Sequence, residues 1–365
     1  MNTPTLRDQK IIRSLRKKYS IVVLGWNRQG QGTSMSSTNS GSDMKLFNVK
    51  GVSNFESHGT LRYIPYMVVF WMWVFLKLCI YRPKIIHACN LDSFFPSYIY
   101  KILFRKKLVF DVFDRYAMAY IPKDRNIFFK ILYSFVNRVE EEFAKRSDVL
   151  INVSDELLKT YKKRPKTCAT IMNCSEDMKN SPKVTWNDFR ILFAGHIRPG
   201  RGLEILPQIV KNLKGTQLII TGRMEDRTLL KNIEGIPNIV YQGFIDQKSL
   251  MKLETNSNIM IALYDLTLQS QNKYVMGNKL FESMMCGLPI ITNVSQEIVK
   301  ETNCGLVVEY ENTEQIKEAI VTLRDNPQLC KRLGDNGRKA FLEKYNWTVM
   351  EQKLYKIYES LLNTK

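Results

Sequence analysis

Short apolar runs that alternate with amphipathic segments dominate the second half of the chain. Apolar residues recur at helical spacing in most of the intervals between these runs. Apolar strands that alternate with helices are typical of a parallel sheet covered on both faces. The pattern therefore predicts a doubly wound α/β domain, with strands at residues 190–194, 217–221, 238–241, 258–263, 289–292 and 306–309.

The first half shows the same alternation less regularly. A helix is predicted over residues 5–18, and a stretch rich in Gly, Ser, Thr and Asn at 29–43 predicts a mobile loop. The polar stretch 175–188 is the best candidate for a linker. We therefore predict an N-terminal domain over residues 1–180 and a C-terminal domain over residues 181–346. The strands expected in the N-terminal domain are 20–24, 84–88, 107–111 and 148–153.

Residues 63–81 form an apolar run that is interrupted by Lys77. A transmembrane helix needs about 20 apolar residues, so a span and a buried helix are both open alternatives. A third is a helix that lies in the membrane surface, with Trp71, Trp73 and Tyr81 at the interface. The sequence favours this interfacial helix over a span.

Charge is distributed unevenly along the 365 residues, whose net charge is +19. Residues 1–180 contain 30 Lys and Arg against 15 Asp and Glu, a balance of +15; the remainder contains 24 against 20, a balance of +4. So basic a half attracts nucleic acid, acidic lipid or a phosphorylated acceptor. The alternative is a basic surface that only keeps the protein in solution.

The cysteines and histidines argue against metal binding. None of the seven cysteines belongs to a C-x-x-C pair, and several lie in apolar runs, as free thiols do in a reducing compartment. The three histidines are not clustered, so we predict no metal site. The polar N-terminus shows no secretory signal.

A predicted helix near residue 280 carries the first candidate chemistry. Asn278 is placed to cap this helix, Glu282 lies on the same face four residues later, and Gly287 suits its C-terminal end. A carboxylate in the first turn can accept hydrogen bonds from sugar hydroxyls, while free amides at a helix start favour phosphate. The alternative is a solvated glutamate on an amphipathic helix.

Residues 193–203 combine a strand end, a Gly-rich turn and a helix start. Such a turn aims backbone N–H groups at phosphate, and Arg201 adds a charged donor. A solvated basic turn is the alternative. Gly222 and Gly243 end two further strands, where they either let a ligand approach the backbone or merely permit tight turns.

The sequence N-K-L-F-E at residues 278–282, followed by Gly287 and Pro289, resembles a motif of glycosyltransferase family 4. The resemblance implies an α/β fold of the GT-B type, with two doubly wound Rossmann-like domains facing a central cleft. It also implies that residues 347–365 form a helix that crosses back to the N-terminal domain. Phrases similar to family motifs occur in the same order at 82–92, 107–116, 146–157, 171–174 and 347–362.

The resemblance implies a nucleotide-sugar site in which Glu282 binds the ribose of the donor. The family motif G-R-x-x-x-x-K-G holds the diphosphate; here His196 takes the Arg position and Arg201 the Lys position, so Arg198 is expected to supply the missing charge. Many relatives carry a second Glu eight residues before Glu282, where this chain has Tyr274. The donor-binding residues expected on this basis are Gly195, His196, Arg198, Arg201, Gly222, Gly243, Tyr274, Asn278, Lys279 and Glu282.

On the N-terminal side, His87 and Asp114 are the candidates for the acceptor side. His87 resembles a family His at a strand end, although a core histidine with satisfied hydrogen bonds is the favoured alternative. Phe113 occupies the position of another family His. Asp114 matches a family Glu that contacts the acceptor or the donor sugar, and capping of a turn is its alternative role. Asp114 and Glu282 are the candidate catalytic residues.

The function implied is a retaining glycosyltransferase that needs no metal or other cofactor and uses a nucleoside-diphosphate sugar as donor. We expect a lipid-linked or cell-surface glycan as acceptor and a peripheral position on an anionic membrane, at its cytoplasmic face. The departures at Tyr274, His196 and Phe113 suggest a catalytically inactive GT-B scaffold as one alternative. A basic nucleic-acid-binding α/β protein is another, but the chain has no evident aromatic–basic RNA motif, so we expect no nucleic acid partner.

The start of the chain departs from the family pattern. Relatives usually begin with a strand and a Gly-rich loop before the first helix, whereas here the helix 5–18 follows Met1 almost directly. We expect either that a segment upstream of Met1 is missing from the sequence or that the N-terminal sheet lacks its first strand.

Overall fold

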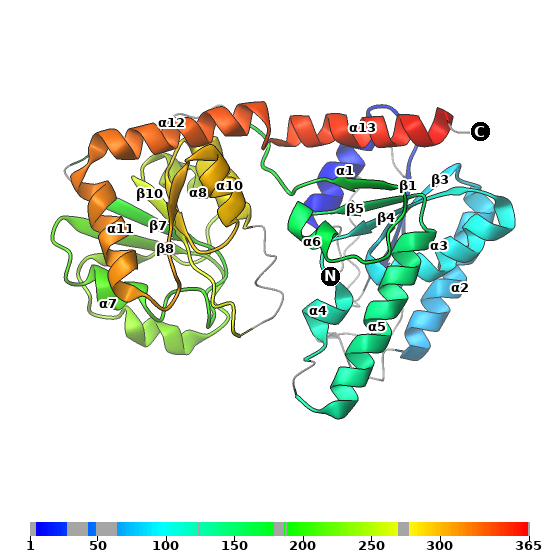
Figure 1. Cartoon of the computed structure of the whole chain (residues 1–365), viewed down its shortest axis with the longest axis horizontal. Helices are drawn as coiled ribbons and strands as arrows, with labels where there is room; N and C mark the ends of the chain where they lie inside the picture. Colours follow the sequence, from blue (N-terminus) through cyan, green and yellow to red (C-terminus); the bar gives the residue numbers. More distant parts are fainter. Residues whose placement is uncertain are drawn as a thin grey trace. The chain divides into compact units, whose positions relative to one another are not determined.

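The computed structural model divides the chain into two compact units (Figure 1). The N-terminal unit comprises Met1–Ile171 together with Glu351–Lys365, and the C-terminal unit comprises Met172–Met350. The described residues are 5–27, 43–48, 64–122, 125–178, 186, 188–268 and 277–363.

The C-terminal unit contains one parallel sheet with the strand order β12-β11-β10-β7-β8-β9. All six strands predicted in this half are present. Their bounds are β7 Phe189–Ala194, β8 Thr216–Thr221, β9 Ile239–Tyr241, β10 Ile259–Ala262, β11 Ile290–Thr292 and β12 Gly305–Val307. The helical segments are α7 Leu206–Val210, η2 Arg227–Asn232, α8 Gln247–Thr255, α9 Asn278–Cys286, α10 Gln296–Thr302, α11 Thr313–Asp325 and α12 Pro327–Glu343.

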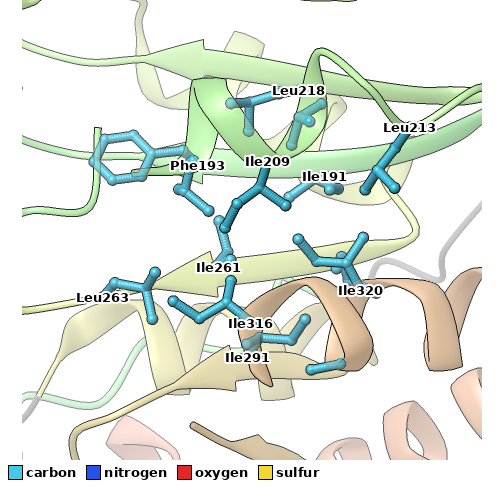
Figure 2. Close-up of a cluster of buried hydrophobic side chains, with 14 of the residues drawn as sticks. Ile191, Phe193, Ile209, Leu213, Leu218, Ile261, Leu263, Ile291, Ile316 and Ile320 are labelled. Carbon is cyan, nitrogen blue, oxygen red and sulfur yellow. The ribbon is translucent and has the colours of Figure 1, made fainter. Parts of the chain in front are cut away.

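Side chains alternate between the two faces of this sheet and join two separate core clusters. Ile191 and Phe193 of β7 pack in a large cluster with α7, α11 and α12, part of which is shown in Figure 2. Leu192 and Ala194 of the same strand pack on the opposite side with α8. This alternation buries both faces of β7, which explains the fully apolar run in the sequence.

Helix α9 is fixed by close backbone packing at its C-terminal end. Gly287 ends the helix with φ = 67°, as predicted. A Cβ atom on Gly334 of α12 would lie 2.0 Å from the Gly287 carbonyl oxygen, so only glycine fits there. The predicted cap at the other end is wrong: Gly277 is the N-cap and Asn278 is already helical. Asn278 instead accepts a hydrogen bond of 3.0 Å from the Asn173 side chain.

The N-terminal unit contains a parallel pair of strands, β1–β2, and a parallel sheet with the order β3-β4-β5-β6. The four predicted strands are present as β1, β3, β4 and β5, while β2 and β6 were not predicted. The predicted loop at 29–43 lies almost wholly outside the described residues. The strand bounds are β1 Val22–Asn27, β2 Asp43–Asn48, β3 Ile85–Cys89, β4 Lys107–Val112, β5 Val149–Asn152 and β6 Thr167–Thr170.

Helices cover both faces of the β3–β6 sheet. Alternate residues of β3 and β4, among them Ile86 and Phe110, pack in one core cluster with α2 and α3. The other face carries α1, whose N-terminus is closed by a capping box between Thr5 and Asp8. The helix bounds are α1 Leu6–Arg16, α2 Ile64–Tyr81, α3 Asn90–Phe104, α4 Tyr116–Tyr120, α5 Ile127–Arg146, α6 Asp155–Lys159 and α13 Trp347–Asn363.

Helix α13 is shared by the two units, because the division falls between Met350 and Glu351. Its second part contacts α1 through a hydrogen bond of 2.8 Å from the Tyr355 hydroxyl to the Ser14 carbonyl and an ion pair of 2.8 Å between Lys17 and Glu351. These contacts attach the C-terminal end of the chain to the N-terminal unit.

Helix α2 accounts for the apolar run at 63–81. Phe70, Val74 and Leu78 are buried on its inner face. In the part of the chain that the structure describes, no helix is long and apolar enough to cross a membrane. The outer face of α2 nevertheless consists of exposed apolar side chains, namely Val68, Val69, Met72, Leu76 and Ile80.

Candidate functional site

Three predicted glycines meet at the carboxyl ends of β7, β8 and β9. The Gly195 N–H donates to the Thr221 carbonyl, and the Gly222 N–H donates to the Gly243 carbonyl, both at 2.9 Å. Gly222 has φ = 144°, and a Cβ atom there would lie 1.7 Å from the Gly195 carbonyl oxygen. Gly222 therefore allows the ends of β7 and β8 to approach closely, at the edge of the sheet where ligands of doubly wound folds bind, and the space beside Gly243 is open.

Lys279 of α9 reaches over this glycine edge. A Cβ atom on Gly195 would lie 2.3 Å from the Lys279 ammonium nitrogen, so the amine occupies the space that the glycine leaves open. Burial lowers the pKa of the Lys279 amine, the nearby Glu282 carboxylate opposes this effect, and the Arg201 cation adds to it. Lys279 therefore lies within electrostatic reach of both Glu282 and Arg201.

Arg201 projects from a turn between two glycines with positive φ, Gly200 at 77° and Gly202 at 87°. Its guanidinium carbon lies 4.3 Å from the ring centroid of Tyr264, which follows β10. Burial lowers the pKa of the guanidinium. No residue in the described ranges makes a hydrogen bond or an ion pair with Arg201 or with Glu282, so both charges remain available to a ligand.

His196 and Arg198 are arranged differently from Arg201. The His196 ring nitrogen Nδ1 is hydrogen-bonded to the Glu225 carboxylate, whose other oxygen lies 4.0 Å from Arg198. Glu225 thus holds both side chains beside the loop that leaves β8. Tyr274, the remaining predicted donor residue, lies outside the described residues.

Asp114 and Phe113 follow β4 in the N-terminal unit. The Phe113 N–H donates a hydrogen bond of 3.0 Å to the Asn90 side chain. Arg115 is buried and donates a hydrogen bond of 2.8 Å to the Thr160 carbonyl. Asp114 between them is exposed, and neighbouring protein atoms raise the pKa of its carboxyl by desolvation. Within the described ranges it has no hydrogen-bond partner, so capping of this turn is not its role here.

His87 belongs to a buried polar network. Its Nε2 lies 3.2 Å from the Asp111 carboxylate and its Nδ1 lies 2.8 Å from the Tyr358 hydroxyl. Asp111 is fully buried and also accepts a hydrogen bond of 2.9 Å from Arg7. Burial raises the pKa of Asp111, but the Arg7 charge and the hydrogen bonds from His87 and Arg7 together lower it below its usual value. Both nitrogens of His87 are engaged, which matches the alternative of a satisfied core histidine.

Comparison with known proteins identifies the class of enzyme. Residues 188–326, which hold the glycine edge and Arg201, Lys279 and Glu282, match the profile of the family described as glycosyl transferases group 1. The chain is 25% identical over 302 residues to an uncharacterized glycosyltransferase of Methanocaldococcus jannaschii, covering 80% of this chain and 72% of that protein. These matches support a glycosyltransferase.

Solved structures show that this glycosyltransferase has the GT-B fold. It is similar to sucrose-phosphate synthase from Thermosynechococcus elongatus, with a TM-score of 0.76 and 15% identity over 98% of this chain and 93% of that one. It is also similar to Anabaena HepE in complex with UDP and glucose, with a TM-score of 0.70 and 14% identity over 99% of this chain and 97% of that one.

Two residues at the candidate site were missed by the sequence analysis. Tyr264 stands directly after a predicted strand, at the end where ligands bind, and this placement was a signal that could have revealed it. Glu254 of α8 is buried next to α9, and the Cys286 thiol donates to its Oε2 atom at 3.6 Å. Its sequence neighbourhood contains no such signal. Among the described residues, no group of three or more His, Cys, Asp or Glu side chains could hold a metal ion.

Proposed function

We propose that this glycosyltransferase moves a sugar from a nucleoside-diphosphate sugar to an acceptor hydroxyl, with retention of configuration. The observation that carries the proposal is the glycine edge of the sheet, beside which Arg201, Lys279 and Glu282 lie close together. The edge is where ligands of doubly wound folds bind, the two cations match a diphosphate, and the carboxylate matches the hydroxyls of a sugar. The similar Anabaena protein binds UDP and glucose, which supports a donor of this class.

Each charged residue has a distinct role in this proposal. The diphosphate lies against Lys279 and Arg201 and pairs its negative charge with these two cations. The same cations stabilise the negative charge that develops on the diphosphate as the sugar departs. Glu282 accepts hydrogen bonds from the ribose. No side chain in the described part of the chain caps α9. The Leu280 N–H donates a hydrogen bond of 2.9 Å to the Gly277 carbonyl, so the Asn278 and Lys279 amides are those open to phosphate.

The direct test is turnover of UDP-, GDP- and ADP-sugars, measured as release of nucleoside diphosphate in the presence of EDTA. Cationic side chains neutralise the leaving diphosphate in this proposal, so we expect turnover without a divalent ion. Activity that disappears with EDTA and returns with Mg²⁺ or Mn²⁺ would contradict the metal independence. Tight donor binding without any turnover would favour the inactive scaffold instead.

We further propose that the acceptor is a lipid-linked or cell-surface glycan made at the cytoplasmic face of a membrane, in polysaccharide biosynthesis. The excess of 30 basic over 15 acidic residues in 1–180 supports a peripheral contact with anionic lipid. The exposed outer face of α2 supplies one apolar surface for this contact. The first half of α5 supplies another, formed by Ile127, Phe128, Ile131 and Phe135.

Co-sedimentation with vesicles tests this contact. Binding to acidic vesicles should exceed binding to neutral ones and should fall as salt rises, because exposed charges are screened beyond about 8 Å at physiological ionic strength. Phe128→Ser should weaken binding to acidic vesicles, whereas Phe244→Ser, at an even more exposed aromatic of the C-terminal unit, should not. Equal weak binding to both lipid types would remove the electrostatic part of the proposal.

A further inference from the structure

The Arg201 guanidinium lies over the ring of Tyr264 at the candidate donor site. The guanidinium carbon lies 4.3 Å from the ring centroid, and Tyr264 is only 6% exposed. An arginine on an aromatic face is stabilised by cation–π attraction, and packing against the ring restricts its rotation. The guanidinium N–H groups therefore keep one orientation, while no described residue uses them in a hydrogen bond.

The backbone of Tyr264 is itself held in place. Asn293 is buried and follows β11. Its side chain accepts a hydrogen bond of 2.8 Å from the Tyr264 N–H and donates one of 2.7 Å to the Tyr264 carbonyl. One side-chain amide thus satisfies both backbone groups of the tyrosine, so the backbone that carries the ring is held in place. The tyrosine hydroxyl lies beside Gly277, where a Cβ atom would be 3.3 Å from it.

The turn that carries Arg201 is packed onto the same support. The Asp265 N–H donates 2.9 Å to the Gly200 carbonyl, which joins the residue after the tyrosine to the residue before the arginine. Cβ atoms on Gly200 and Gly202 would lie 2.7 Å from Leu268 and 3.0 Å from Leu263, respectively. The position of the Arg201 side chain is therefore set both by the packed backbone of its turn and by the Tyr264 ring that it covers.

On the basis of the proposed function, we propose that Tyr264 is a positioning residue: its ring orients the Arg201 guanidinium for the diphosphate of the donor. A flexible arginine in water loses side-chain entropy when it binds phosphate, and a pre-stacked arginine loses less. The ring contributes to donor affinity in this way without needing to touch the donor.

The test compares Tyr264→Phe, which keeps the ring, with Tyr264→Leu and Tyr264→Met, which remove it and keep apolar volume. Binding of UDP, GDP and ADP is measured by calorimetry in the folded proteins. We expect the Phe variant to bind within about twofold of the wild type and the Leu and Met variants about tenfold more weakly. In an Arg201→Ala background, Tyr264→Leu should have no further effect on affinity.

Two further readouts separate positioning from a merely structural role. The ¹⁵Nε–Hε signal of Arg201 should show a ring-current shift in the wild type and the Phe variant and lose it in the Leu and Met variants. Wild-type affinity in the Leu or Met variant, or an equal loss in the Arg201→Ala background, would overturn the inference alone. A wild-type protein that binds none of the three nucleotides would instead overturn the proposed function, and the inference with it.

Discussion

Replacing Gly222 with alanine is expected to abolish nucleotide binding and to lower the free energy of unfolding by about 3 kcal/mol. The new methyl group would lie 1.7 Å from the Gly195 carbonyl oxygen and 2.6 Å from the Gly195 carbonyl carbon. Both are backbone atoms, so no side chain can move aside and the ends of β7 and β8 must separate. This separation would displace the backbone over which Lys279 lies.

The control for this prediction is Gly235→Ala. Gly235 also has a positive φ, 73°, but a Cβ atom there would meet nothing within 4 Å. The Gly235→Ala variant should therefore lose only about 1 kcal/mol of unfolding free energy, the cost of the left-handed backbone for a residue with a side chain. Its nucleotide affinity should not change. Urea unfolding and calorimetric titration of both variants provide the measurements. Similar losses in the two proteins would show that backbone conformation, rather than close approach of the strands, sets the cost.

Replacing Glu254 with glutamine is expected to stabilise the protein much more at pH 8 than at pH 5. Burial raises the pKa of this carboxyl to about 8, and the negative charge of Glu282 adds to the rise. The residue is 3% exposed, and its Oε1 atom has no hydrogen-bond partner within the described ranges. In the unfolded chain the same group has a pKa of about 4.3.

The sign of the pH dependence follows from these two pKa values. Between them the unfolded chain releases a proton that the folded chain keeps, so the contribution of Glu254 to stability is full below about pH 4.3 and is lost as the pH rises to 8. The slope approaches 1.4 kcal/mol per pH unit, roughly. Urea unfolding from pH 5 to pH 8 should therefore give diverging stabilities for wild type and Glu254→Gln. Glu318→Gln, at an exposed position, serves as the control, and parallel curves for Glu254→Gln would refute the prediction.

The sequence predicted the sheet of the C-terminal unit well because the signal is local. Runs such as 258–263 are buried on both faces of the sheet and read as continuous apolar strands. β6 was missed because its burial pattern is exposed and intermediate, and its residues Thr167–Thr170 carry no apolar run. The cap of α9 was misplaced by one residue, because asparagine is a strong N-cap residue in sequence terms.

The candidate site was only partly predictable, for a similar reason. Glycines at the ends of parallel strands must meet at one edge, so Gly195, Gly222 and Gly243 could be placed together from the pattern alone. The support of Tyr264 by Asn293 joins residues 29 positions apart, and the burial of Glu254 depends on how α8 meets α9. Contacts of this kind depend on tertiary packing and leave no periodic signal in the sequence.

Calorimetric titration of UDP, GDP and ADP tests the central claim, that the C-terminal unit binds a nucleoside-diphosphate sugar, most directly. The proteins to compare are the wild type, Arg201→Ala and Glu282→Ala, with Arg332→Ala and Glu318→Ala as exposed controls of the same charge. The account predicts that the wild type and both controls bind one of these nucleotides equally well. Arg201→Ala and Glu282→Ala should bind it at least about tenfold more weakly, a loss of about 1.4 kcal/mol, with unchanged unfolding midpoints. Equal affinity in all five proteins, or no binding by the wild type, would contradict the account.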